Sequence, residues 1–361
     1  MALEGIIIII LVNFGIYWRT LRYGFVSDDI EPSKRKKDNT KYWLKGQDIK
    51  TEPHTVKNWW HRMWLQTIGA VYFKKQEGHF ITMCLHTINC LLIFLVFGKN
   101  YTTLIAALLF SINPVNTQGG SIWLSGKIYS FSTMLGLLMF SCPILAPGFF
   151  YLMKFFSINA IAIPLLFLTT PYWYLAFMTP FGIYMYRKIL KQKRKVGTNS
   201  EMRKIAPHKI IPYLKSFGYY FFLCLAPWRI ALYHSFLWGL GVHTVYDSHH
   251  YKLNKDFWYG LFCFLGVVYG IVATWGSLTS FGLLWFIINI TMWCNIVTYQ
   301  QQISERCCYT ANIGLMIALA SLVSGHPMII AIIFTHYLTR LHNIIPMYQN
   351  EFWHTHYSIH G

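Results

Sequence analysis

Carboxylates are scarce in this sequence. Only 12% of its 361 residues are charged, and 13 acidic residues stand against 31 Lys and Arg. After Glu4, no Asp or Glu lies inside a long apolar segment, and between Glu77 and Asp247 the one acid is Glu201. Proton-coupled carriers place acids within their membrane spans, so this absence weighs against a transporter. It also leaves few residues that could act as a catalytic base.

Metal-binding and secretory patterns are missing as well. The eight cysteines are scattered, with no CxxC pair and no HExxH motif, and the neighbours Cys307 and Cys308 are poorly placed to bridge. We therefore expect neither a disulfide framework nor a zinc site. The first residues have no basic stretch and no small-residue cleavage site follows them, so we expect the first apolar segment to stay as a membrane anchor.

Apolar residues make up 55% of the chain and fall in discrete blocks between basic or polar stretches. This pattern predicts an all-α polytopic membrane protein. The formal charge of +18 lies in the loops, where membrane orientation and anionic lipid account for it without nucleic acid. We expect about 11 transmembrane helices, near residues 5–18, 79–97, 101–112, 119–141, 150–169, 171–186, 212–226, 257–275, 278–295, 309–323 and 326–340.

The loops predict an orientation. Residues 187–209 carry nine Lys and Arg against Glu201, which is the clearest positive-inside signal. Placing that loop in the cytoplasm puts the N-terminus inside, and it puts the first loop (19–78) and the polar tail (341–361) outside. The first loop is itself basic, but long translocated loops escape the charge rule. Its Trp-rich piece, 59–64, predicts an amphipathic helix lying in the membrane interface.

Four short motifs occur in order along the chain. An acidic pair follows the first apolar segment, two histidines open the second, a polar Asn-Pro segment precedes the fourth, and a Glu-Arg pair precedes the tenth. The motifs are Phe25-Val26-Ser27-Asp28-Asp29; His79 and His86; Phe110-Ser111-Ile112-Asn113-Pro114-Val115-Asn116-Thr117-Gln118 with Trp123-Leu124-Ser125-Gly126-Lys127; and Ser304-Glu305-Arg306-Cys307-Cys308-Tyr309.

Together these motifs resemble those of the GT-C class of polytopic glycosyltransferases. Within that class, the motifs look like those of the membrane domain of the transmembrane and tetratricopeptide-repeat O-mannosyltransferases and of their bacterial and phage relatives. The resemblance covers nearly the whole chain and implies one GT-C-like domain over residues 1–340, without the repeats. It implies an inverting hexosyltransferase that moves a sugar from a polyprenyl-phosphate carrier, such as dolichyl phosphate mannose, to a hydroxyl of a protein or glycan acceptor. The reaction would take place at the outer face of a bacterial inner membrane or the lumenal face of the endoplasmic reticulum.

The chain departs from the family pattern in several places. Thr82 stands where an asparagine is usual, Gln118 where a glutamate is usual, and Lys127 where an arginine is usual; Thr169-Thr170-Pro171 replaces an expected Ser-Lys-Glu. The glutamates usual at Gln118 and in the Ser-Lys-Glu segment are both absent. The loss of these two acids argues against a metal site, so we expect no required cofactor. A catalytically inactive scaffold that binds the lipid carrier or a partner protein is therefore an alternative function, and a lipid or sugar transporter is a weaker one.

Sugar transfer to a hydroxyl requires a base. The resemblance assigns this role to Asp28, with Asp29 orienting it or binding the acceptor, because adjacent residues in an extended loop point in different directions. The alternative is a solvated or helix-capping acidic pair.

The carrier phosphate requires cations. Arg306 has the fixed fork of donors that suits a phosphate, although an ion pair with Glu305 is a rival role. Lys127 would act as a point charge, and four residues after Trp123 it should share a helix face with that ring.

Other motif residues are expected to line the site. His79 and His86, seven residues apart, predict a polar hydrogen-bonded pair on one face of a helix rather than a metal site. Asn116 and Gln118 are expected to contact sugar hydroxyls. Glu305 and Tyr309 complete the predicted site.

Overall fold

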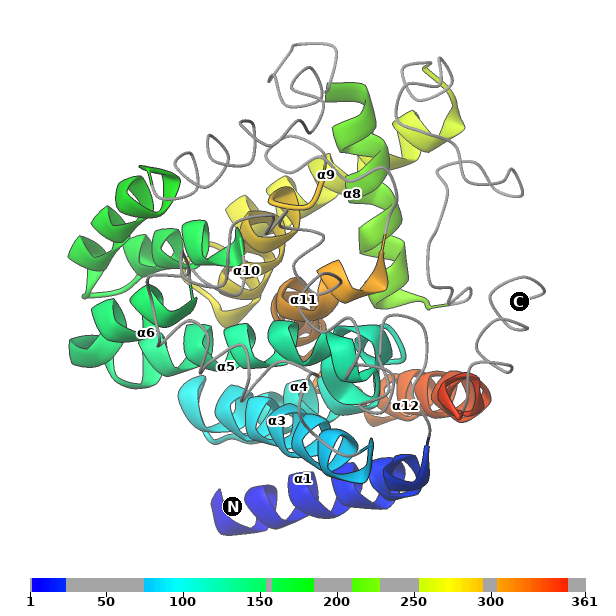
Figure 1. The fold of residues 1–361 in the computed structure, drawn as a ribbon. Helices are drawn as coiled ribbons and strands as arrows, with labels where there is room; N and C mark the ends of the chain where they lie inside the picture. The colour runs from blue at the N-terminus through cyan, green and yellow to red at the C-terminus, as the bar shows by residue number, and fades with distance from the viewer. Residues whose placement is uncertain are drawn as a thin grey trace, which may run out of the picture.

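A computed structural model describes residues 2–23, 75–153, 158–184, 210–227, 253–294 and 304–349. The acidic pair, the predicted interfacial helix, the basic loop 187–209 and most of the C-terminal tail lie outside these residues. Every regular element in the described part of the chain is helical, and no strand occurs there (Figure 1). The prediction of an all-α fold is therefore confirmed.

The N-terminal helices pack on one another. α1 (Ala2–Tyr17) continues into a 3-10 turn, η1 (Trp18–Arg22), and packs against both α3 (Lys75–Val96) and α4 (Tyr101–Ile112). α4 has the bounds predicted for the third span. It begins at a capping box, because the Asn100 side chain accepts a hydrogen bond from the Thr103 N–H and the Thr103 hydroxyl accepts one from the Asn100 N–H.

A compact polar connection separates α4 from α5 (Lys127–Ser141). It holds a π turn, η3 (Thr117–Ser121), and a 3-10 turn, η4 (Leu124–Gly126). A continuous helix is impossible here because Gly120 has a φ of +119°. Trp123 is extended, at φ −68° and ψ 125°. The prediction of one span over 119–141 was therefore wrong in its first part, and Trp123 does not share a helix face with Lys127.

The spans predicted at 150–169 and 171–186 are also interrupted. The chain forms η5 (Pro143–Leu145), α6 (Ala146–Met153), η6 (Ile158–Ile161), η7 (Ile163–Thr169) and η8 (Trp173–Phe177), followed by a helical stretch at 178–184. Pro164 lies at the start of η7 and Pro171 lies between η7 and η8. Since proline lacks the backbone N–H that an α-helix needs, short 3-10 turns replace the expected long helices in this region.

The C-terminal half contains two tightly packed helix pairs. α8 (Ile210–Leu225) packs against α9 (Lys255–Ala273), and α10 (Leu278–Thr291) packs against α11 (Cys308–Val323), which follows the turn η12 (Glu305–Cys307). A Cβ added at Gly282 would lie 2.5 Å from the carbonyl oxygen of Gly314, so glycine is what lets α10 and α11 approach this closely. The last elements are α12 (Pro327–Ile344) and η13 (Ile345–Tyr348).

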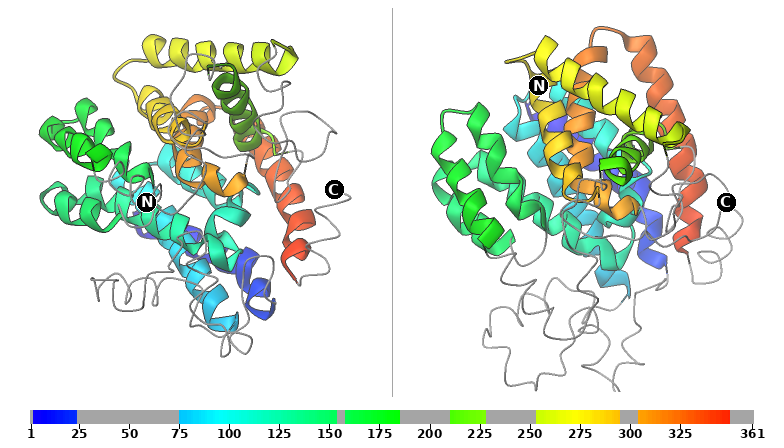
Figure 2. Two further views of the ribbon diagram at one scale, coloured as in Figure 1. Left: turned by 45° about the horizontal axis from the view of Figure 1, so that its top comes forward. Right: turned by 90° about the horizontal axis from the view of Figure 1, so that it is seen from above.

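Four described segments are long and apolar enough to cross a membrane: Ala2–Arg22, Glu77–Val96, Lys255–Ala273 and Glu305–Val323. Four shorter apolar helices accompany them, and the count of 11 spans stays a prediction. α11 is buried along most of its length and lies inside the bundle, with α9 and α12 on the outside (Figure 2). By contrast, Leu11 of α1 is 65% exposed and Phe262 of α9 is 68% exposed. Apolar outer faces around a packed centre are typical of a membrane-embedded helix bundle.

Candidate functional site

Polar side chains gather in the interior where α3, the connection 113–126 and the start of α11 meet. Each of these segments carries one of the motifs found in the sequence. All of the members are buried except Arg306, which is half-buried: His79, Thr82, His86 and Asn89 of α3; Asn113, Asn116, Thr117, Gln118 and Ser121 of the connection; Lys127 and Ser130 of α5; and Glu305, Arg306, Tyr309 and Asn312 of η12 and α11. We call this set the polar cluster.

His86 ties three helices together within the polar cluster. The Ser111 carbonyl oxygen of α4 can only accept, so the Nε2–H of His86 donates a hydrogen bond to it at 3.2 Å. The other ring nitrogen, Nδ1, then accepts a hydrogen bond from the Tyr309 hydroxyl of α11 at 2.7 Å. Tyr309 Oη in turn accepts the Asn89 amide at 3.2 Å, and Tyr17 Oη donates to Ser111 at 2.6 Å. His86 is fully buried with both ring nitrogens bonded, which is the position of a structural histidine.

A chain of asparagines links the connection to α11. Asn312 Nδ2 donates to Asn116 Oδ1 at 3.1 Å, and Asn116 Nδ2 donates to the Phe110 carbonyl at 2.6 Å. Asn113 fixes the turn by accepting the Val115 N–H at 3.1 Å, and it donates to the Cys224 carbonyl of α8 at 2.8 Å. The Asn-Pro-Val-Asn motif therefore stabilises the packing of the helices. The amide oxygen and the amide nitrogen of Asn116 are both hydrogen-bonded within the protein.

Arg306 lies against an aromatic ring of the connection. Its guanidinium carbon is 5.5 Å from the centre of the Trp123 ring, a cation–π arrangement. η12, which carries Arg306 and the fully buried Glu305, packs against η3. His79 donates from Nδ1 to the carbonyl of Ile122, next to Trp123, at 3.1 Å. The second and fourth motifs thus contact neighbouring residues, Ile122 and Trp123, of the same short connection.

Lys127 and Gln118 belong to the same part of the polar cluster, at the start of α5 and in the π turn. Both are almost wholly buried, with 1% and 2% of their surfaces exposed. A Cβ at Gly126 would strike the Gln118 carbonyl oxygen, so the glycine before Lys127 is what lets the π turn fold back onto the start of α5. An ammonium group so deep in an apolar bundle is costly unless its surroundings compensate it.

The described part of the polar cluster brings together eight of the ten residues predicted for the site. These are His79, His86, Asn116, Gln118, Lys127, Glu305, Arg306 and Tyr309. Asp28 and Asp29 lie outside the described residues. Within the described ranges no group of three His, Cys, Asp or Glu side chains could hold a metal ion.

Sequence reasoning missed Asn89 and Asn312, which connect the motif residues to one another. Asn89 follows His86 by three residues on α3, and Asn312 follows Tyr309 by three residues on α11. Residues three apart on a helix share a face. The helix-face reasoning that joined His79 to His86 could therefore also have found Asn89 and Asn312.

We expect His86→Phe to destabilise the protein by about 1–2 kcal/mol, because hydrogen bonds to two buried groups are lost. The loss is limited because both groups retain another hydrogen bond: the Ser111 carbonyl still accepts from the Tyr17 hydroxyl, and the Tyr309 oxygen still accepts from the Asn89 amide. Thermal unfolding in detergent measures it. The matched control is His326→Phe, because His326 is exposed and its side chain makes no capping hydrogen bond. Equal melting temperatures for both variants would contradict a structural role for His86.

The polar cluster thus combines a half-buried arginine on an aromatic ring, a buried lysine and carboxylate, and a hydrogen-bonded frame that holds them. Neither a scan of protein-family models nor searches of curated proteins and solved structures gives a match to this chain.

Proposed function

We propose that this protein is a membrane glycosyltransferase of the GT-C type, moving a sugar from a polyprenyl-phosphate carrier to an acceptor hydroxyl. One observation carries the proposal: motifs that lie far apart in the sequence meet in one polar cluster. His86 bonds to Tyr309 at 2.7 Å, and Arg306 lies 5.5 Å from the Trp123 ring centre. Structural packing alone needs no arginine, lysine and carboxylate at the same place in an apolar bundle.

The cations of the polar cluster suit the leaving phosphate. The Arg306 residue is half-buried, and its guanidinium lies over the Trp123 ring, which restricts its orientation. A guanidinium donates two parallel hydrogen bonds to phosphate oxygens, and in a low-dielectric site such contacts stabilise developing charge strongly. We assign donor phosphate binding to Arg306, with Lys127 as a second positive charge.

The first loop begins beside the polar cluster, at Tyr23. Tyr23, the last described residue before the first loop, places its ring 6.5 Å from the ring of His79. Asp28 is five residues further on, and five extended residues span at most about 18 Å. We therefore assign the general base to Asp28, which would take the hydroxyl proton, and we assign to Asp29 the role of orienting it.

The test is transfer by purified protein in liposomes, supplied with labelled dolichyl or undecaprenyl phosphate mannose and a hydroxyl-rich acceptor peptide. We expect label to move to the acceptor and free polyprenyl phosphate to accumulate. Mass spectrometry of glycans from cells with and without the chain identifies the natural product. Carrier binding without any transfer, together with unchanged glycans, would contradict the proposal.

A catalytically inactive scaffold is the second candidate. Gln118 replaces a glutamate and is buried, and the threonines in place of the Ser-Lys-Glu use their hydroxyls locally: Thr169 donates to the Leu166 carbonyl at 2.8 Å and Thr170 to the Phe167 carbonyl at 2.9 Å. These threonines bring no charge to the site. Carrier binding without transfer is the result this alternative predicts.

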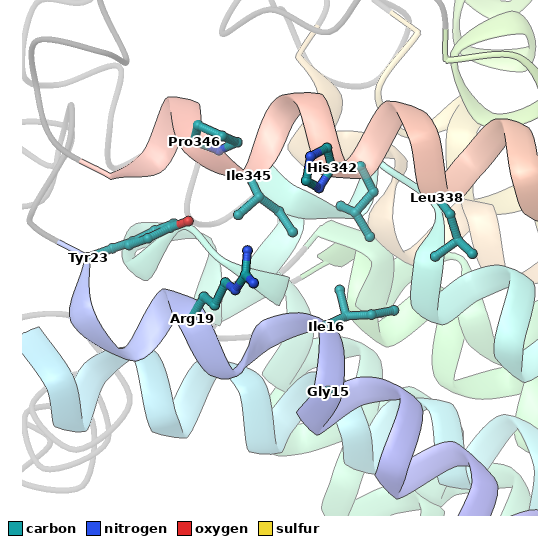
Figure 3. Close-up of a pocket in the computed structure, with 9 residues that line it drawn as sticks. Gly15, Ile16, Arg19, Tyr23, Leu338, His342, Ile345 and Pro346 are labelled. Atoms are coloured by element: carbon teal, nitrogen blue, oxygen red, sulfur yellow. The ribbon is translucent and has the colours of Figure 1, made fainter.

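We further propose that the N-terminus lies in the cytoplasm and the C-terminus outside, in a multi-pass inner-membrane or endoplasmic-reticulum protein. The basic loop 187–209 supports this orientation, and so does the parallel course of two helices: α1 with η1 and α12 with η13 run past each other in the same direction (Figure 3). Their N-terminal ends therefore lie on one side of the membrane. This is what we expect when the first and the last spans belong to an odd number of spans.

A cysteine introduced at Asn199, in the basic loop, should react with a membrane-impermeant reagent only after the cells are permeabilised. Labelling of intact cells at this position would overturn the orientation.

A further inference from the structure

A groove runs between the first and the last described helices. It has a volume of about 460 Å³ and is lined on one side by Gly15, Ile16, Arg19 and Tyr23, and on the other by Leu338, Leu341, His342, Ile345 and Pro346 (Figure 3). We call it the α1–α12 groove. None of its lining residues was predicted for the sugar-transfer site.

The groove exists because α1 and α12 both pack against α4. Gly15 widens it. A Cβ added at Gly15 would meet nothing within 4 Å, and the residue is exposed, so open space lies over this turn of α1.

The chemistry of the lining changes along the groove. One end, at Gly15, Ile16 and Leu338, has no polar side chain. The other end carries the Arg19 guanidinium, which extends from η1 into the space below α12, together with the Tyr23 hydroxyl and the His342 imidazole (Figure 3). No acidic side chain is among the lining residues, so this end favours an anion.

The surroundings indicate that the anion carries a lipid tail. The outer faces of both flanking helices are apolar: Leu3 and Leu11 of α1 and Met328 and Ile332 of α12 are largely exposed. Such faces meet hydrocarbon in a membrane. The cationic end of the groove lies at the end of the candidate span Ala2–Arg22, where headgroups are found, and the apolar end lies toward its middle.

We propose that the α1–α12 groove binds an anionic phospholipid of the bilayer. Arg19 donates charge-assisted hydrogen bonds to the phosphate, and the Tyr23 hydroxyl and His342 imidazole lie on the same side of the headgroup. One acyl chain follows Ile16, Leu338 and Leu341 toward the membrane interior. The lipid fills the space between the first and the last described helices and so joins them.

The test is native mass spectrometry of the purified protein with added phosphatidylglycerol or phosphatidylcholine. We expect the protein to retain phosphatidylglycerol preferentially. Arg19→Gln should weaken phosphatidylglycerol binding roughly tenfold, to the level of phosphatidylcholine, because the charge-assisted contact is lost. Arg22→Gln is the matched control: it removes the same charge from the same turn, but Arg22 lines a different hollow with Trp18 and Glu77.

A second pair of variants tests the acyl-chain end. Gly15→Phe should fill the groove without a clash and reduce retention of both lipids. Gly266→Phe on α9 is its control, because a Cβ there also meets nothing within 4 Å and Gly266 does not line the groove. All four positions are exposed, so we expect all four variants to fold.

Three results would overturn the proposal: equal retention of the two lipids by the unmodified protein, equal effects of Arg19→Gln and Arg22→Gln, or equal effects of the two glycine substitutions. Tighter binding of a polyprenyl phosphate than of phosphatidylglycerol would also overturn it, since the occupant would then be the sugar carrier. The readout is lipid retention, so it is independent of whether sugar transfer takes place.

Discussion

Asp28→Asn should abolish most sugar transfer while leaving donor binding intact. Asparagine keeps the size of the side chain and much of its hydrogen bonding, but it lacks the basicity needed to take a hydroxyl proton. A positioned general base contributes roughly 10²–10⁴-fold to the rate, so turnover should fall by that factor. Donor affinity should hold because we assign phosphate binding to Arg306 and Lys127, which belong to other segments.

The measurement is transfer by purified protein with labelled donor and an identified acceptor, next to a separate donor-binding assay. Asp29→Asn is the matched control, since it removes a neighbouring carboxylate and should have a milder effect if that residue only orients the base. Full turnover in Asp28→Asn would move the role to Asp29. Full turnover in both single variants and in the double variant would leave the first loop without a catalytic function.

Arg306→Ala should weaken binding of the polyprenyl-phosphate donor by roughly ten- to a hundredfold, as expected for the loss of charged hydrogen bonds worth about 1.5–3 kcal/mol. Arg306→Lys should recover only part of the affinity. Lysine keeps the charge, but it has no planar fork to hold two phosphate oxygens or to stack on Trp123. Trp123→Leu should give a smaller loss than Arg306→Ala, because it leaves the guanidinium but removes the ring that positions it.

Equilibrium binding of a labelled donor in detergent measures these changes. Arg340→Ala is the matched control, since Arg340 is another half-buried arginine, on α12 and outside the polar cluster. Undiminished donor binding by Arg306→Ala would show that Arg306 does not bind the phosphate and has only a structural role. A similar loss in Arg340→Ala would show that the effect is not specific to the polar cluster.

Local sequence signals determined the fold class and several helix bounds. α4 has the predicted bounds, Tyr101–Ile112, because a capping asparagine precedes its apolar run and Asn113-Pro114 ends it. The starts of α8, α9, α10, α11 and α12 lie within two residues of those predicted. These helix bounds can be predicted from the sequence because burial of apolar side chains in the membrane and capping of the backbone both depend on a few neighbouring residues. The motif residues were also visible, and the separation of seven correctly placed His79 and His86 on one helix.

Only the tertiary structure decided how these pieces meet. The connection 113–126 folds back because Gly120 adopts a positive φ and Ser130 donates to the Gly119 and Gly120 carbonyls, at 3.2 and 2.9 Å. The apolar residues flanking it looked like continuous helix in sequence. The bond between His86 and Tyr309, the glycine contact between α10 and α11, and the groove between α1 and α12 all join residues far apart in the chain. No periodicity or composition encodes such pairs, because each depends on the packing of the whole bundle around α11.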